Sequence, residues 1–251
     1  MLMGKTTETS YSIIFLIMKY LSTDYENYPG SQNFSPELLE TIKDELPQEG
    51  NLLDLGSGLG TLKKYLNKNV EYIGIDGSTT AINSWNDGNN VLGNIGIRNE
   101  KKNLGLPFME NSFDFVFCKD VIVHFDLDMR LLLFKEISRV LKTSGRLMLV
   151  SYLEPNKGTM SYKKIGSEEV RSFFIQYATM QQYELYSKIF NPPEGHALVY
   201  PFFIVEQNSV EDQLYESGLR KISWNSIFTT KNNWYNEEIE KSVWIYQNLN
   251  P

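Results

Sequence analysis

The segment NLLDLGSGLG, residues 51–60, constrains the fold of this chain more than any other stretch. A short apolar run bounded by turn residues is typical of a buried parallel strand. Gly56, Gly58 and Gly60 follow this run, and glycine permits both a positive φ and a close approach of the backbone to a ligand. The segment therefore predicts a strand, then a tight ligand-binding turn, then a helix over residues 61–68.

The residues around this turn distinguish between two kinds of ligand. A dinucleotide places its pyrophosphate at the helix N-terminus, so its turn carries a third glycine one position later and avoids carboxylates. Here Thr61 occupies that position, and Asp54 lies two residues before the first glycine. A carboxylate suits the ammonium and sulfonium groups of S-adenosylmethionine, which the turn therefore favours. A plain glycine-rich loop without a ligand is the alternative.

Strands and helices alternate through the first half of the chain. Ser35 and Pro36 form an N-cap and first-turn pair that opens a helix over 35–46, and Gly145 is the expected C-cap of a later helix. The other expected elements are strands at 70–76, 113–120 and 146–152 and a helix at 129–142. This order predicts an α/β fold with a doubly wound, mostly parallel, Rossmann-like sheet and a ligand at the carboxyl ends of its strands.

The second half is expected to add a cap to this core. Segments rich in tyrosine and phenylalanine predict helices that form an inserted substrate cap, and a helix, a stop at Gly218 and a strand then return to the core. The final segment is ambiguous between helix and strand, so it stays open whether the chain supplies the last antiparallel strand. The predicted division is a helical lid at 1–34, a cofactor-binding core at 35–154, the helical cap at 155–208 and the rest of the core at 209–251.

Composition and charge exclude several classes of function. The net charge is −7, the pI is near 5.0, and the lysines and arginines are scattered, so we expect no nucleic-acid partner. Only one cysteine, Cys118, and two histidines, His124 and His196, are present, which argues against a metal site and fits a reducing, cytoplasmic location.

The apolar run at 11–21 is too short to span a membrane. We expect it to be a helix packed on the domain, with a membrane-surface anchor as the alternative.

Several later motifs, taken in order, point to one enzyme class. DLGSGLG is followed by GIDGS, then by PFMENSFDFVFCKDVIVHF and LKTSGRLMLVSY, and YENYPGSQNFS precedes the first helix. Over residues 51–152 this order resembles class I S-adenosylmethionine-dependent methyltransferases. Within the class, the chain looks most like the phosphoethanolamine and small-amine N-methyltransferase group. The resemblance reinforces the choice of S-adenosylmethionine as cofactor.

The resemblance also implies roles for individual residues. Tyr25 and Ser35 would contact the methionine end of the cofactor, near Asp54. Asp76 ends the second strand, where a carboxylate can accept both ribose hydroxyls. Asp120 and His124, from a D-x-x-x-H motif, would stand beside the reacting group. The full predicted cofactor set is Tyr25, Ser35, Asp54, Gly56, Gly58, Gly60, Asp76, Gly77, Asn103, Leu104 and Lys119.

Two positions depart from the pattern of that group. Lys102 stands where an aspartate near the adenine amine is usual, and Asn103 is the nearest hydrogen-bonding substitute. Ile17 stands where the phosphobase enzymes have a tyrosine, and Tyr20 on the next turn is its nearest replacement. The predicted substrate residues are Tyr20, Tyr152 and Tyr162. Aromatic side chains of the cap would form a cation–π box for an ammonium group, or else simply the core of the cap.

These features predict methyl transfer from S-adenosylmethionine to a small molecule, with an amine nitrogen as acceptor and His124 as general base or orienting residue. An amine must lose a proton before it attacks, and an imidazole with a pKa of ~6.5 is a suitable proton acceptor. Oxygen or carbon methylation, cofactor binding without catalysis and nicotinamide-dependent oxidoreduction are the alternatives. Structural alternatives are a core histidine for His124, a helix cap for Asp120 and simple packing for Cys118. The sequence predicts no oligomeric state.

Overall fold

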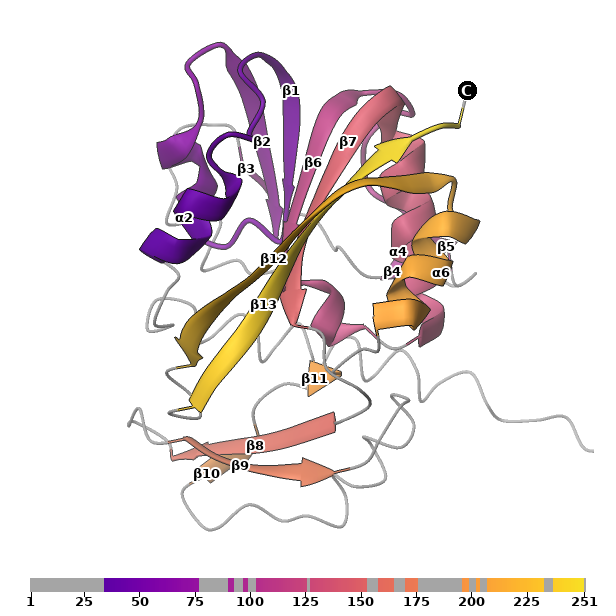
Figure 1. Cartoon of the computed structure of the whole chain (residues 1–251). Coiled ribbons are helices and arrows are strands. Elements are labelled where there is room, and N and C mark those ends of the chain that lie inside the picture. Colours follow the sequence, from indigo (N-terminus) through magenta and orange to yellow (C-terminus); the bar gives the residue numbers. More distant parts are fainter. Residues whose placement is uncertain are drawn as a thin grey trace, which may run out of the picture.

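A seven-stranded sheet forms the centre of the molecule in the computed structural model (Figure 1). The structure describes residues 34–76, 90–92, 97–98, 103–125, 127–152, 158–164, 170–175, 196–198, 202–203, 207–232 and 237–250. The strand order is β12-β13-β7-β6-β1-β2-β3. The strands are β1 (Gly50–Leu55), β2 (Val70–Asp76), β3 (Asn90–Leu92), β6 (Phe113–Lys119), β7 (Leu141–Tyr152), β12 (Leu219–Asn232) and β13 (Glu237–Asn248).

Strand directions confirm the predicted doubly wound, mostly parallel sheet. β1 pairs in parallel with β2 and β6, and the pairs β2–β3 and β6–β7 are also parallel. β13 runs antiparallel to both of its neighbours, β7 and β12. The ambiguous final segment is therefore a strand, and it supplies the antiparallel strand that the sequence left open.

Alternating side chains of the strands build one core on each face of the sheet. Leu52 of β1 and Phe117 of β6 belong to the core under α2 (Pro36–Ile42), whereas Leu53 of β1 and Cys118 of β6 face the opposite core. That second core is covered by α4 (Leu127–Val140) and α6 (Gln207–Glu216). Both faces of the sheet are buried, which explains why its central strands are almost continuously apolar.

The helices begin largely where the sequence predicts. The Ser35 hydroxyl accepts a hydrogen bond from the Leu38 amide at 3.3 Å, and Pro36 is the first helical residue of α2. This helix ends at Ile42 rather than at residue 46. After the glycine turn, only a short 3₁₀ helix, η2 (Thr61–Tyr65), replaces the helix expected over 61–68.

The prediction that Gly145 caps a helix is wrong. α4 ends at Val140, and β7 begins at the next residue, Leu141. The side-chain amide of Asn248, from β13, donates to the carbonyls of Ser138 and Leu141 at 2.9 and 3.0 Å. A side chain distant in sequence thus satisfies the carbonyl groups at the end of α4, which otherwise need a glycine-based cap.

The described residues of the predicted cap between 158 and 203 form strands rather than helices, and only its last two residues, 207 and 208, lie in a helix, α6. The strands are β8 (Gly158–Lys164), β9 (Val170–Ile175), β10 (His196–Leu198) and β11 (Phe202–Phe203), which make a four-stranded antiparallel sheet. β-branched and aromatic residues in these segments favour strands over helices. His196 lies in β10 and pairs with Lys164 of β8. Figure 1 shows this small sheet beyond the carboxyl ends of the parallel strands, where β11 contacts the segment that carries His124.

Two further strands form a small sheet of their own. β4 (Ile97–Arg98) and β5 (Asn103–Leu104) form a short antiparallel pair.

Across the described ranges, we find no helix that has both the length and the apolar character to cross a bilayer. The apolar run at 11–21 lies outside these ranges.

Candidate functional site

The carboxyl ends of β1, β2 and β6 bring the predicted site residues to one edge of the sheet. In the parallel register, Leu55 of β1 pairs with Ile75 of β2 and with Cys118 of β6. The glycine turn, Asp76 and Asp120 directly follow or end these strands and therefore lie at the same edge. This is the edge where open α/β sheets bind ligands.

The glycine turn is tight, and it needs glycine. Gly56, Gly58 and Gly60 have φ values of 74°, 53° and 71°, all in the left-handed region that other residues rarely adopt. A Cβ at Gly56 would also lie 2.3 Å from the Val121 side chain. The amides of Gly56 and Ser57 both donate to the Ile75 carbonyl, at 2.9 and 3.1 Å. The turn is thereby held against the end of β2.

Asp76 joins the end of β2 to the glycine turn. Its carboxylate is buried and accepts a hydrogen bond from the Gly58 amide at 2.8 Å. Beside it, the Ser57 hydroxyl is buried and has no hydrogen-bond partner among the described residues. Two predicted cofactor residues, Asp76 and Gly58, are thus in direct contact.

Asp54 is the second buried carboxylate at this edge. Burial raises its pKa to about 7, and the negative charge of Asp76 adds to this rise. The Tyr72 hydroxyl donates to Asp54 at 2.7 Å, which opposes the rise, as does the positive charge of Lys119. Asp54 is therefore close to its midpoint of ionisation at neutral pH, and a nearby cation would favour its charged form.

Asp120 is the third carboxylate, and its surroundings differ from those of Asp54. It directly follows β6 with a φ of 58°, and its amide donates to the Val150 carbonyl at 2.9 Å. Its Oδ2 atom accepts hydrogen bonds from Lys119 Nζ at 2.7 Å and from Lys241 Nζ at 2.6 Å. The other oxygen, Oδ1, is buried, and no described residue donates a hydrogen bond to it.

The two lysines decide the ionisation of Asp120. Burial by itself would raise the pKa of Asp120, but the charges and hydrogen bonds of Lys119 and Lys241 outweigh it and hold the pKa well below its usual range. Burial lowers the pKa of Lys241 to about 8, despite the opposing effect of Asp120. Asp120 does not cap the following 3₁₀ helix, η3 (Ile122–His124), whose N-cap is Val121. The capping interpretation of Asp120 is therefore wrong.

His124 ends η3, four residues after Asp120. Its side chain is half-buried, and its amide donates to the Val121 carbonyl at 3.0 Å. Contact between η3 and β11 places this histidine between the parallel sheet and the small antiparallel sheet. Its predicted role as a base or orienting residue remains a prediction.

Some of the remaining predicted residues lie in described parts of the structure, and others do not. Ser35 caps α2, and Lys119 Nζ lies 5.8 Å from the centre of the Phe34 ring. Asn103 and Leu104 lie in β5, Tyr152 ends β7 opposite Lys241, and Tyr162 lies in β8 opposite Arg171. The roles predicted for Tyr20, Tyr25 and Gly77, and the departures at Ile17 and Lys102, concern residues outside the described ranges.

Three residues of the site were missed by the sequence analysis. Ser57 lies within the glycine turn, so its place in the sequence was a sufficient signal. Tyr72 lies two residues before Gly74, which pairs with Asp54. Residues two apart on a strand face the same side of the sheet, so this alternation along β2 could have indicated Tyr72 as a neighbour of Asp54. Lys241 lies 121 residues from Asp120, and nothing in its local sequence indicates that partner.

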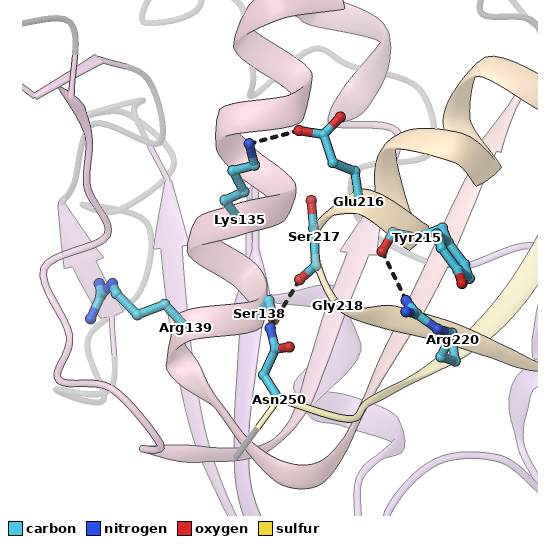
Figure 2. A pocket seen from close by; sticks show the side chains of 9 residues that line it. All are labelled: Lys135, Ser138, Arg139, Tyr215, Glu216, Ser217, Gly218, Arg220 and Asn250. Carbon is cyan, nitrogen blue, oxygen red and sulfur yellow. Dashed lines mark hydrogen bonds and ion pairs between the residues drawn. The ribbon is translucent and has the colours of Figure 1, made fainter.

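A separate groove of about 450 Å³ lies between α4 and α6, near the start of β12 (Figure 2). Asn250 occupies part of it and donates to Ser138 Oγ at 2.9 Å and to the Ser217 carbonyl at 3.2 Å. Lys135 and Glu216 pair at 2.9 Å along its rim. These polar groups satisfy one another, and none of the predicted site residues lines the groove. Among the described residues, no cluster of histidine, cysteine, aspartate and glutamate could hold a metal ion.

Comparison with known proteins finds a methyltransferase match in the central part of the chain. Residues 53–149 match the family model described as a methyltransferase domain. A phosphoethanolamine N-methyltransferase from Plasmodium falciparum is 33% identical over 137 residues, which cover 53% of this chain. The chain matches only 50% of the length of that relative.

Solved structures show the same fold at low sequence identity. A S-adenosylmethionine-dependent methyltransferase from Methanosarcina mazei matches with a TM-score of 0.59 and 17% identity, over 87% of this chain and 100% of that one. A 1,6-didemethyltoxoflavin N1-methyltransferase from Burkholderia thailandensis, solved with its substrate and S-adenosylhomocysteine, matches with a TM-score of 0.58 and 10% identity. That match covers 100% of this chain and 94% of the Burkholderia enzyme.

Proposed function

Because residues 53–149 form a S-adenosylmethionine-dependent methyltransferase domain, we propose that the protein transfers a methyl group to an amine nitrogen of a small molecule. The observation that carries this proposal is the Asp120 carboxylate at the carboxyl edge of the sheet. It is held ionised, and its buried Oδ1 atom has no hydrogen-bond donor in the described part of the chain. An anionic acceptor atom at this place suits a substrate that arrives as an ammonium ion.

The residues at the glycine turn fit S-adenosylmethionine, whose sulfonium supplies the methyl group. Asp54 lies where a carboxylate can attract the ammonium of the methionine moiety, and an added cation would draw its raised pKa downward. Asp76 lies against the turn, where it can accept hydrogen bonds from the ribose hydroxyls. The buried hydroxyl of Ser57, which has no partner, offers a further polar contact.

On the acceptor side, this chain would hold the amine and remove its proton. Methyl transfer is an in-line displacement, so the protein mainly positions the nitrogen lone pair and excludes water. Asp120 would bind the ammonium form, and His124, four residues later, would accept the proton before the nitrogen attacks. Tyr152 and Tyr162, at the end of β7 and in β8, would add aromatic faces for a cationic substrate.

The Plasmodium relative gives the amine proposal its second support, because its name specifies N-methylation of phosphoethanolamine. Since the match spans only half of that relative, the acceptor of this protein is a proposal of ours and not a finding. We expect a small-molecule acceptor and no nucleic-acid partner, in line with the acidic net charge of −7.

The function can be tested in two stages. Calorimetry with S-adenosylmethionine and S-adenosylhomocysteine measures cofactor binding, and mass spectrometry then detects methylated products from phosphoethanolamine, ethanolamine and a metabolite extract. We expect binding of both cofactor forms and methylation at nitrogen. A product methylated at oxygen or carbon would overturn the amine assignment. Tight binding without any product would instead favour a non-catalytic binding protein.

Replacement of the predicted base gives a residue-specific check of the same proposal. His124→Ala should lower kcat by about 100-fold or more, because general base catalysis typically contributes factors of this size. Affinity for S-adenosylhomocysteine should stay within about twofold of wild type, since His124 is assigned to the acceptor side. An unchanged kcat would show that His124 is structural.

A further inference from the structure

We propose that Lys241 is a positioning residue, which holds the Asp120 carboxylate ionised and oriented so that Oδ1 faces the ammonium of the acceptor. This inference rests on the proposed function and adds to it a residue from the last strand of the sheet. Lys241 belongs to β13, far in sequence from the methyltransferase domain that residues 53–149 form.

The fold brings Lys241 to the site through the antiparallel register of β13. Lys241 pairs with Tyr152, the last residue of β7, and therefore lies at the carboxyl edge of the parallel strands. From there its Nζ atom reaches Asp120 Oδ2 at 2.6 Å. The lysine is only 6% exposed. A buried ammonium group is unfavourable unless it is paired with a negative charge. The ion pair with Asp120 provides this negative charge for Lys241.

The hydrogen bonds at Asp120 leave its two oxygens in different states. Oδ2 accepts from both Lys119 and Lys241, whereas Oδ1 is buried and accepts from no donor among the described residues. A buried carboxylate oxygen without a donor is uncommon in folded proteins and indicates a place for a ligand donor. With Oδ2 fixed from two sides, the carboxylate cannot rotate freely, and Oδ1 keeps one direction.

The backbone at Asp120 supports a specific placement of this side chain. Its φ of 58° lies in the left-handed region, which strains most residues other than glycine, although aspartate adopts it more readily than most. The hydrogen bond from its amide to Val150 and the ion pairs of its side chain hold it there. Strained residues of this kind concentrate at functional sites, where the surrounding structure maintains them.

The two lysines have different surroundings, which is why Lys241 is assigned to Asp120. The positive charge of Lys119 also acts on Asp54, and Lys119 lies over the Phe34 ring. The described charged groups that act on one another in this cluster are Asp54, Asp76, Lys119, Asp120 and Lys241, whereas burial raises the pKa of the Cys118 thiol and keeps it neutral. Burial lowers the pKa of Lys241 to about 8, so the lysine is charged at neutral pH and loses its charge in mildly alkaline solution.

The test compares Lys241→Met with Lys241→Gln and with a matched control, Lys221→Met. Lys221 is an exposed lysine on the neighbouring strand β12 and pairs with Glu211 at 2.7 Å on the surface. Initial rates are measured with phosphoethanolamine and with ethanolamine as probes across a range of pH. Affinity for S-adenosylhomocysteine reports whether each variant is folded and keeps its cofactor site.

We expect Lys241→Met to raise KM for both probes by about 10- to 100-fold, the factor expected for loss of a charged hydrogen bond, with a smaller change in kcat. The acid limb of kcat/KM should move to higher pH, because Asp120 loses one of its two cations. Lys241→Gln should behave similarly, since it lacks the charge. Lys221→Met should match wild type in both respects.

Other outcomes would overturn the inference, and they are distinguishable from failure of the proposed function. If wild type methylates the probes and both Lys241 variants retain wild-type KM and pH profile, Lys241 is not a positioning residue. A defect confined to phosphoethanolamine would show that Lys241 pairs with the phosphate of the acceptor instead. If neither variant binds S-adenosylhomocysteine, Lys241 is structural. Wild type that binds S-adenosylhomocysteine but methylates no amine would contradict the proposed function itself.

Discussion

Three carboxylates at the carboxyl edge of the sheet, Asp54, Asp76 and Asp120, have three different surroundings. Asp54 is buried, and its pKa is raised to about 7. Asp76 accepts a hydrogen bond from the glycine turn, and Asp120 is bound by two lysines that hold its pKa low. Asp54 and Asp120 thus differ in ionisation, because burial dominates the pKa of Asp54 and two neighbouring lysines dominate the pKa of Asp120. Such differences allow separate roles toward cofactor and acceptor.

At this scale, Asp76→Ala should weaken binding of S-adenosylhomocysteine by roughly 1–3 kcal/mol, because the ribose hydroxyls would lose a charged acceptor. Calorimetry measures the change directly. Glu71→Ala is the matched control, since Glu71 is an exposed carboxylate on the same strand. If the two variants bind the ligand equally well, Asp76 does not contact the cofactor.

Asp54 should make stability depend on pH in a definite direction. Its folded pKa of about 7 exceeds the reference value of 3.8, so the folded state binds this proton more tightly than the unfolded state. The contribution of Asp54 to stability is therefore fully present below pH 4 and declines as the pH rises toward 7. Asp54→Asn removes this dependence.

Urea denaturation of wild type and Asp54→Asn at several pH values between 4.5 and 8 measures the effect. The variant should gain stability relative to wild type by roughly 1 kcal/mol per pH unit up to pH 7, and the difference should then level off. Other titrating groups are common to both proteins and cancel in the difference. A difference independent of pH would show that Asp54 titrates normally.

At the scale of the elements, α4 and β13 depend on each other at the end of the helix. Asn248 of β13 donates to the carbonyls of Ser138 and Leu141, and its Oδ1 atom accepts from Ser138 Oγ at 3.0 Å. The chain therefore enters β7 without a glycine cap. One amide side chain joins the end of α4, the start of β7 and the last strand.

Asn248→Ala should destabilise the folded protein by about 1–3 kcal/mol, because buried carbonyl groups would lose their donor. The free energy of unfolding in urea measures this loss. Asn69→Ala, at an exposed position before β2, serves as the control and should change stability by less than about 0.5 kcal/mol. Equal stabilities of the two variants would mean that water replaces Asn248 at no cost.

For the whole molecule, the central sheet separates two cores of unequal composition. The core under α4 and α6 contains Trp244 and Phe134, and both are almost completely buried. The core under α2 contains Phe115 and Phe117. Because β13 contributes Trp244 to one core and Val243 and Ile245 to the other, the last strand supports both faces of the sheet and also supplies Lys241 to its edge.

Trp244→Ala should therefore lower the free energy of unfolding by about 3–5 kcal/mol, the usual effect of removing a large buried aromatic side chain. Its indole nitrogen has no hydrogen-bond partner within the described ranges, so the change leaves no described polar group unpaired. Met109→Ala is the control because Met109 is 81% exposed. A loss for Trp244→Ala as small as that of the control would show that the core closes over the cavity.

Local sequence patterns were sufficient to predict the features of this protein that depend only on residues close together in the chain. The alternation of apolar segments, the N-cap at Ser35 and the glycines of the turn predicted the parallel sheet, the start of α2 and the tight turn after β1. Each of these features is read within a few residues, because strand burial, capping and left-handed φ are local properties. The glycine turn and Asp76 could be placed together because parallel strands end at one edge.

Features that depend on contacts between residues far apart in the chain became visible only in the tertiary structure. The choice of strand partners in the cap, where β8 pairs with β9, β10 and β11, depends on contacts between segments that are distant in the sequence. Gly145 was not a cap, because Asn248 supplies the hydrogen bonds from 107 residues away. Lys241 likewise reaches Asp120 through the register of β13. Hydrogen bonds and charges act through space, so their partners follow from the packed fold and not from the order of residues along the chain.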